Sequence, residues 1–304
     1  MKKNVEYIDG IQVYKDFDGQ SIYNPTNDRL LELTKGDASD FLKSSESSFF
    51  KHGRPRRRRY FDFVIFGGSI KLSKIKNFLE LLDSILSNKA IIYFAAIAQL
   101  IALIYITGNV LINVQNFKFY DTHYSINSIL TVGLIYLIMT FITMLHEMGH
   151  VASYSRELSI TEVFLGVEIR YGVMLLFFTS VPFIDKLDSK SQIDVILSGI
   201  KSQLVLGLIP LILLPFEQTS FLGYVLFVMN FIYMLLNALP FMKLDGYWAI
   251  NKWMGVEDYS KELWHSIKNH QYPGNAILAL NILNWIMIGI LIFASIKEVW
   301  QVLS

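Results

Sequence analysis

The chain is 304 residues long, with 53% hydrophobic and only 17% charged residues. About 25% of the residues of an ordinary soluble protein are charged, so the apolar excess must face something other than water. A net charge of +1 excludes a generally basic protein that binds nucleic acid. The chain has no cysteine, so any metal would have to be held by histidine and carboxylate side chains. These features predict a membrane protein.

Charge divides the chain into a polar N-terminal region, residues 1–89, and a set of apolar segments. A helix needs roughly 20 mainly apolar residues to cross a bilayer. Lys201 interrupts one such segment, and we expect it near the polar end of its span or extended toward the membrane surface. The predicted fold is therefore an α-helical multi-pass membrane protein with about five transmembrane helices. The predicted spans are residues 90–112, 124–145, 195–216, 218–242 and 271–296.

The basic residues predict the orientation. With the N-terminus in the cytoplasm, all but two of the 27 Lys and Arg residues lie on the cytoplasmic side, Lys118 and Lys297 being the exceptions. The positive-inside rule therefore favours a cytoplasmic N-terminus and an external C-terminus in the cell membrane. The basic block at residues 54–59 precedes the first span, where attraction to anionic lipid headgroups explains it better than nucleic-acid binding.

The N-terminal region shows short patterns of its own. Residues 12–14 and 21–23 have the composition of a β-hairpin, and residues 28–33 and 38–43 that of two short helices. The order has a faint likeness to small winged-helix modules that hold leader peptides, but a structural cap is the preferred interpretation. Aromatic residues also crowd the stretch between the last two predicted spans, which predicts a cytoplasmic segment, residues 251–270, lying against the headgroups. These aromatic residues are Tyr247, Trp248, Trp253, Tyr259, Trp264 and Tyr272.

The chemistry-bearing motif is His146-Glu147-Met148-Gly149-His150, near the inner end of the second predicted span. Residues four apart share one face of a helix, so both imidazoles can reach one metal ion, with Glu147 beside them as a proton acceptor. Ionisable groups within a span are costly and are usually functional. The alternative is a pair of core histidines with a buried glutamate bound to one of them.

A catalytic zinc site needs a third protein ligand. Asp245 is the best candidate, because it lies at the inner end of the fourth predicted span, at the depth of His146. Gly246 follows it and lets the backbone pass close to a metal centre. The alternative role of Asp245 is an N-cap for the next segment. The other histidines are on the wrong side or in cytoplasmic segments; they are His52, His123, His265 and His270.

Both motifs together resemble the site-2 protease family of intramembrane zinc metalloproteases. The second motif reads Asn237-x-x-Pro240-x-x-x-Leu244-Asp245-Gly246, and the likeness covers residues 124–250, the length of that family's three-helix core. The resemblance implies one zinc ion held by His146, His150 and Asp245, with Glu147 as the catalytic base. Tyr247-Trp248, directly after the second motif, is similar to the branch of peptide zinc metalloproteases associated with peptide maturation.

The sequence departs from that family at two places. The family's middle core helix commonly carries Gly-Pro and a downstream Asn, where this chain has Ser198-Gly199-Ile200-Lys201-Ser202-Gln203. A proline that often precedes Leu-Asp-Gly is replaced here by Met242-Lys243. These changes concern helix packing and the path of the substrate rather than the metal ligands.

A cytoplasmic β-hairpin is predicted between the first two core helices. Residues 160–171 alternate apolar and polar side chains, and residues 174–183 form a second strand-like run. One interpretation is a hairpin that packs on the core. The favoured one is an edge strand that holds an extended peptide substrate by backbone pairing, and the resemblance supports it.

Together these patterns predict an intramembrane zinc endopeptidase that cleaves a small membrane-associated precursor peptide. Its expected partners are this peptide, the lipid bilayer and, as a further candidate, a peptide exporter. A non-catalytic immunity or export partner that binds the same peptide is the alternative, and an ion-coupled transporter is weakened by the lack of visible repeats. The predicted divisions are residues 1–89, 90–112, the metalloprotease core 124–250, the interfacial segment 251–270, and the last span with its tail, 271–304.

Overall fold

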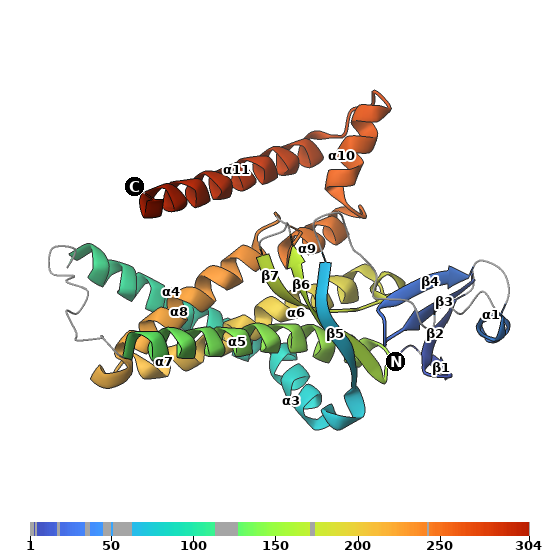
Figure 1. Cartoon of the computed structure of the whole chain (residues 1–304), viewed down its shortest axis with the longest axis horizontal. Helices are drawn as coiled ribbons and strands as arrows, with labels where there is room; N and C mark the ends of the chain where they lie inside the picture. The colour runs from blue at the N-terminus through green and yellow to red at the C-terminus, as the bar shows by residue number, and fades with distance from the viewer. Residues whose placement is uncertain are drawn as a thin grey trace.

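The computed structural model describes residues 3, 5–16, 19–33, 37–44, 50, 63–112, 127–170, 174–241 and 243–303. Figure 1 shows long helices running side by side, with a small sheet at one end and a second sheet beside the helices. The basic block at residues 54–59 and the predicted outer loop with Lys118 and His123 lie outside the described residues.

The N-terminal sheet is an antiparallel meander of four strands. The predicted hairpin is confirmed, because residues of the second and third strands pair, Val13 with Ile22. The predicted helix at residues 28–33 is wrong, since this segment is the fourth strand. Asp28 has a φ of 53° and reverses the direction of the chain. Backbone pairing with the third strand then outweighs the local preference of these residues for a helix. The elements are β1 Glu6–Ile8, β2 Ile11–Asp16, β3 Gly19–Asn24, β4 Arg29–Leu33 and the predicted short helix α1 Ala38–Lys43.

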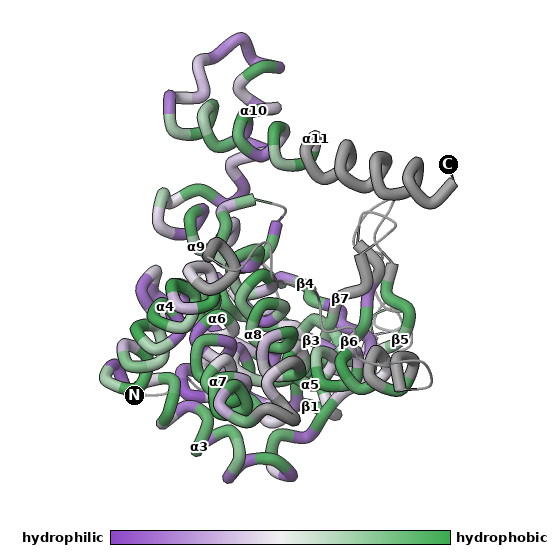
Figure 2. The backbone as a smooth tube through the Cα atoms, turned by 90° about the vertical axis from the view of Figure 1, so that its left-hand side faces the viewer, coloured by the Kyte–Doolittle hydropathy of each residue, from purple (hydrophilic) through white to green (hydrophobic). Residues whose placement is uncertain are grey.

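Three helical stretches of the described residues are long and apolar enough to cross a membrane: Lys89–Gly108, Gly133–Glu157 and Ser189–Leu213. The other two predicted spans coincide with shorter apolar stretches, Leu222–Ala238 and Asn275–Gly289. Figure 2 looks roughly along the first three of these stretches and shows mostly hydrophobic residues in them. The helices are α3 Lys76–Ser87, α4 Lys89–Ile112, α5 Asn127–Glu157, α6 Ser189–Leu206, α7 Leu208–Leu213, α8 Glu217–Ala238, α9 Asp245–Met254, α10 Tyr259–Lys268 and α11 Asn275–Leu303.

The second sheet contains three antiparallel strands in the order β5-β6-β7. The predicted hairpin is present as β6 Glu162–Arg170 and β7 Met174–Thr179, although β7 ends four residues before the predicted limit. The sequence patterns do not predict β5 Phe63–Lys71, which pairs with β6 along the edge opposite to β7. Its run of apolar residues and two glycines lacks the alternation that indicates a half-buried strand.

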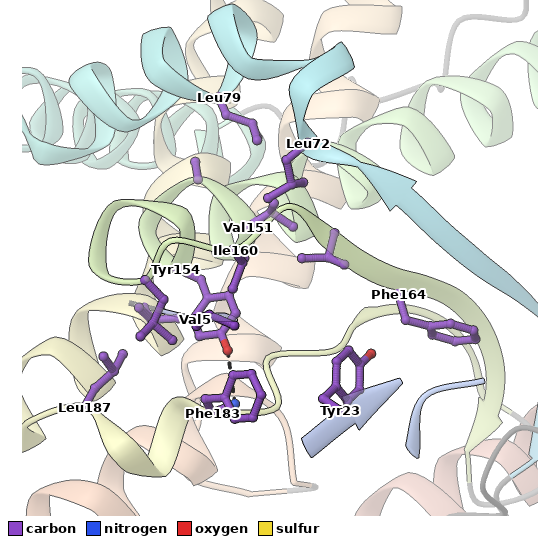
Figure 3. Close-up of a cluster of buried hydrophobic side chains, with 14 of the residues drawn as sticks. Val5, Tyr23, Leu72, Leu79, Val151, Tyr154, Ile160, Phe164, Phe183 and Leu187 are labelled. Carbon is purple, nitrogen blue, oxygen red and sulfur yellow. Dashed lines mark hydrogen bonds between the residues drawn. The ribbon is translucent and has the colours of Figure 1, made fainter. Parts of the chain in front are cut away.

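A buried cluster joins the N-terminal sheet to the long helices. Val5 and Tyr23 of the N-terminal part pack in it with Tyr154 of α5 and Phe183, which follows β7. Figure 3 shows these side chains meeting between the sheet and the helices. Backbone bonds reinforce the contact, since the N–H of Lys3 donates to the carbonyl of Glu157. The N-terminal sheet is thus fixed to the segment that follows the His146-Glu147 helix.

Arg156 connects three helices where α5 ends. Its guanidinium lies 3.0 Å from Asp83 of α3 and contacts Asp194 of α6. Lys201 pairs with the same Asp194, so it extends along α6 toward other charges rather than into lipid. Burial is the main influence on Asp83 and raises the pKa of its carboxyl, despite the opposing charge of Arg156.

Candidate metal centre

The two histidines of α5 point into one space. Their Nε2 atoms lie 3.3 Å apart, as the four-residue spacing on a helix predicts. The Nδ1 atom of His150 lies 2.8 Å from the carbonyl oxygen of Val195 on α6. Because a carbonyl only accepts hydrogen bonds, this contact assigns the proton to Nδ1 and leaves the lone pair of Nε2 for a ligand.

Asp245 joins these histidines from almost a hundred residues further along the chain. Its Oδ2 atom lies 3.1 Å from Nε2 of His146 and 3.4 Å from Nε2 of His150. The alternative role as an N-cap is wrong, because Asp245 is the first residue of α9. The N-cap is Leu244, and no side chain caps this helix.

Two glycines let the backbones approach closely enough to form this group. A Cβ atom on Gly199 of α6 would lie 2.5 Å from Nε2 of His150 and 2.6 Å from Nε2 of His146. A Cβ atom on Gly246 would lie 2.2 Å from the carbonyl oxygen of Ala238. The first glycine therefore keeps open the space into which the imidazoles point, and the second allows α9 to lie against the end of α8.

The donor set and its spacing fit a metal ion. The three ligand atoms all lie within 4.8 Å of one another, and this is the one group of three such residues found in the described parts of the chain. Ligands about 2.0–2.1 Å from one tetrahedral ion lie roughly 3.3 Å apart, close to the distances found here. The His146, His150 and Asp245 side chains could thus hold a metal ion without rearrangement.

Glu147 lines a cavity of about 670 Å³ together with the three candidate ligands. It is one residue from His146, so its side chain leaves α5 in another direction. Thr179, at the end of β7, lines the same cavity. The cavity therefore brings together an acid, the candidate metal ligands and the end of a strand.

Further residues line the cavity around the centre, and two of them, Tyr233 and Glu168, had no functional signal in the sequence. Tyr233 of α8 approaches His146 with ring centroids 6.2 Å apart, and it lines the cavity. Glu168 of β6, 1% exposed, also lines it. Asn237, part of the second motif, lines the cavity and lies 3.5 Å from Gln203. An isolated Tyr or Glu between apolar residues does not indicate which cavity it will face.

The remaining histidines stay apart from the centre where the structure describes them. His265 lies on α10 and His270 follows it, and both are exposed. His52 and His123 are outside the described residues. The prediction that His265 and His270 are not metal ligands agrees with these positions.

A polar cluster fixes the loop before Asp245. Lys243 has a φ of 55° and pairs with Asp258, which also accepts a hydrogen bond from Tyr247 and caps α10. The indole of Trp248 donates to the carbonyl of Lys243. Burial alone would raise the pKa of Asp258, but the hydrogen bonds from Lys243 and Tyr247 lower it below its ordinary value. These contacts hold α9 in position.

Comparisons of the chain with protein-family models, with curated proteins and with solved structures find no match. The geometry therefore defines a candidate metal centre, formed by α5 and the start of α9, within a membrane-compatible helical protein.

Proposed function

We propose that the protein is an intramembrane zinc endopeptidase of the site-2 protease type, which hydrolyses a peptide bond in a small membrane-associated precursor. The observation that carries this proposal is the meeting of His146, His150 and Asp245, with ligand atoms 3.1–3.4 Å apart, beside Glu147 in one cavity. Maturation of a secreted peptide is the proposed role, and a peptide exporter is a proposed partner.

Zinc is the proposed ion because its usual ligands are imidazole and carboxylate when no thiolate is available. Three protein ligands leave a fourth position open, as catalytic zinc sites require. When bound, zinc would supply a Lewis acid that acidifies water and polarises the scissile carbonyl.

Glu147 is the proposed general base and acid. Its carboxylate takes a proton from the attacking water and then returns it to the amine of the leaving peptide. The hydrogen bond between His150 and the Val195 carbonyl holds one imidazole in the tautomer that a ligand needs. Each of these steps uses side chains that already face the cavity.

The end of β7 is the proposed place for the peptide backbone. This strand is the last in the order β5-β6-β7, and Phe177 to Thr179 line the cavity. A peptide in extended form can pair with such an edge regardless of its sequence. A helical substrate must unwind before it binds there, because helical hydrogen bonds shield its carbonyls.

The proposed location is the cell membrane, with the N-terminus in the cytoplasm and the centre near the cytoplasmic side. The charge distribution supports this orientation. Lys243, Lys252 and Lys261 are among the residues that line the cavity, and they count with the basic residues of the proposed cytoplasmic side.

Glu147→Gln tests the function. The variant keeps the size of the side chain but accepts no proton, so cleavage should fall at least about 10²-fold while bound zinc remains. The assay uses full-length protein in lipid vesicles and a single-span model peptide of about 20 apolar residues, with lysine flanks and a fluorophore–quencher pair. Zinc without cleavage by the wild type would favour a non-catalytic peptide-binding partner. Normal cleavage by the variant would exclude Glu147 as the base.

A further inference from the structure

The two faces of the N-terminal sheet pack against different parts of the protein. Ile22 and Tyr23 are neighbours on β3, so their side chains point to opposite faces. Ile22 packs with Val13 and Leu42 inside the N-terminal region. Tyr23, 1% exposed, packs in the cluster that includes Tyr154 and Phe183 of the membrane core. One face thus stabilises the sheet, and the other is built into the core.

The core-facing side of this sheet holds Phe183. The Tyr14 ring stacks on the Phe183 ring at 5.7 Å between centroids, and the Tyr23 ring meets it edge-on at 6.3 Å. The hydroxyl of Tyr154, on α5, accepts a hydrogen bond from the Phe183 N–H at 3.0 Å. Figure 3 shows Tyr154, Phe183 and Tyr23 in this arrangement. Phe183 is 1% exposed, so its backbone has little freedom.

Phe183 does not line the cavity itself, but it belongs to a segment that forms one of its walls. Ser180, Pro182 and Ile184 on either side of it all line the cavity, together with the candidate metal ligands. The wall directly follows β7, whose end is the proposed place for the substrate. We define this wall as residues 180–184.

The Tyr23 hydroxyl is held within the N-terminal region, where it donates to Asp28 at 3.1 Å. The contact of Tyr23 with the wall is therefore the packing of its ring on Phe183.

We propose that Tyr23 is a positioning residue for the proposed proteolysis, and that the N-terminal sheet is a structural part of the substrate cleft. Tyr23 acts through Phe183, which fixes the wall against which the peptide lies. Tyr23 is not among the residues that line the cavity of the candidate ligands and Glu147. Removing it should weaken peptide binding and leave the metal centre intact. Only the prediction about peptide binding and cleavage rests on the proposed function.

The test compares Tyr23→Ala with Ile22→Ala, a truncation of the neighbouring side chain on the opposite face of β3. With the model peptide in vesicles, Tyr23→Ala should raise KM at least fivefold, keep kcat within twofold and leave the zinc content unchanged. Ile22→Ala should lower thermal stability but leave KM unchanged. Tyr23→Phe keeps the packing on Phe183 and loses only the bond to Asp28, so its KM should stay within twofold of the wild-type value.

A second readout does not depend on cleavage. The chain has no cysteine, so Ile184→Cys gives one thiol in the wall, and its rate of reaction with N-ethylmaleimide reports the mobility of the wall. Adding Tyr23→Ala should speed labelling at least tenfold, and adding Ile22→Ala less than twofold. Tyr14→Leu removes the ring that stacks on Phe183 and should give an intermediate labelling rate. This variant replaces Tyr23→Ala in the labelling experiment if Tyr23→Ala does not fold.

Equal effects of Tyr23→Ala and Ile22→Ala on both readouts would overturn the proposal, because they would indicate general loosening of the N-terminal sheet. Unchanged labelling in Tyr23→Ala and in Tyr14→Leu would overturn it as well. If the wild type cleaves no peptide, the proposed function fails, and the labelling result still determines whether Tyr23 fixes the wall.

Discussion

The Nδ1 atom of His150 lies 2.8 Å from the carbonyl oxygen of Val195, a residue of the neighbouring helix α6. One turn further along α6, Gly199 faces the Nε2 atoms of both histidines. Helix α6 therefore orients a candidate ligand from one side and leaves room for an ion on the other. Although α6 supplies no candidate ligand, it fixes the orientation of His150 and the space available to an ion.

Gly199→Ala should abolish most metal binding. The new Cβ would lie 2.5–2.6 Å from the two imidazole Nε2 atoms, where the ion should be, so zinc affinity should fall at least tenfold. Elemental analysis of purified protein measures this change. Gly133→Ala is the matched control, because a Cβ on that helical glycine meets nothing within 4 Å. Full zinc in Gly199→Ala would contradict the placement of the ion.

His146→Ala, His150→Ala and Asp245→Ala should each reduce bound zinc from about one ion per chain to a small fraction, because each removes one of the three ligands. His265→Ala and His270→Ala should retain it, since both residues are exposed on or after α10. The metal content of purified protein, before and after chelation and zinc return, tests the set. Retained zinc in Asp245→Ala with loss in His265→Ala would make the third ligand wrong.

Asp258→Asn should destabilise α9 and α10 at neutral pH. Because the folded pKa of Asp258 is lowered, its stabilising effect is present above the unfolded value of about 3.9 and is lost as pH falls through the folded value. Losing charged hydrogen bonds should lower the unfolding free energy by about 1–3 kcal/mol at pH 7. The effect should shrink as the pH falls below the unfolded value of about 3.9.

Tryptophan fluorescence during thermal unfolding in detergent measures this difference, because Trp248 and Trp253 lie on α9 and Trp264 on α10. Glu257→Gln is the control, as it changes the neighbouring exposed carboxylate. Equal melting of Asp258→Asn and wild type at pH 7 would argue against the role of the Lys243 pair.

Arg156→Met should destabilise the packing of α3, α5 and α6. It leaves Asp83 and Asp194 without their shared partner, so the loss should be about 1–3 kcal/mol for a partly buried charge network. Lys76→Met removes an exposed pair with Glu80, of side chains 70% and 65% exposed, and should cost less than about 0.5 kcal/mol. Similar melting temperatures for the two variants would rule out a structural role for the Arg156 network.

Single cysteines test the orientation. An impermeant maleimide should label Asp121→Cys on intact cells, since residue 121 is predicted to be external, and Lys268→Cys only after the membrane is opened. Lys268 is exposed at the end of α10, so access to the reagent does not limit its labelling. The reverse pattern would place the candidate centre near the outer face.

The motif of α5 could be predicted from the sequence because helical periodicity alone brings residues four apart together. The meeting with Asp245 could be anticipated only from the predicted depth of its span and from the resemblance, since contact between distant helices has no local signal. β4 was mistaken for a helix and β5 was missed, because both depend on pairing with other strands. The roles of Gly199 and Val195 could not be predicted from the sequence, because they depend on how α6 packs against α5.

The pairing of β5 with β6 carries a consequence for how the chain threads the membrane. β5 precedes α4, and β6 follows α5, yet the two strands share one sheet. If both helices cross the bilayer, they must therefore form an outward and a return passage, whichever way the whole protein is oriented. Deleting either α4 or α5 would then place β5 and β6 on opposite sides of the membrane. The sheet therefore needs α4 as much as it needs its own strands.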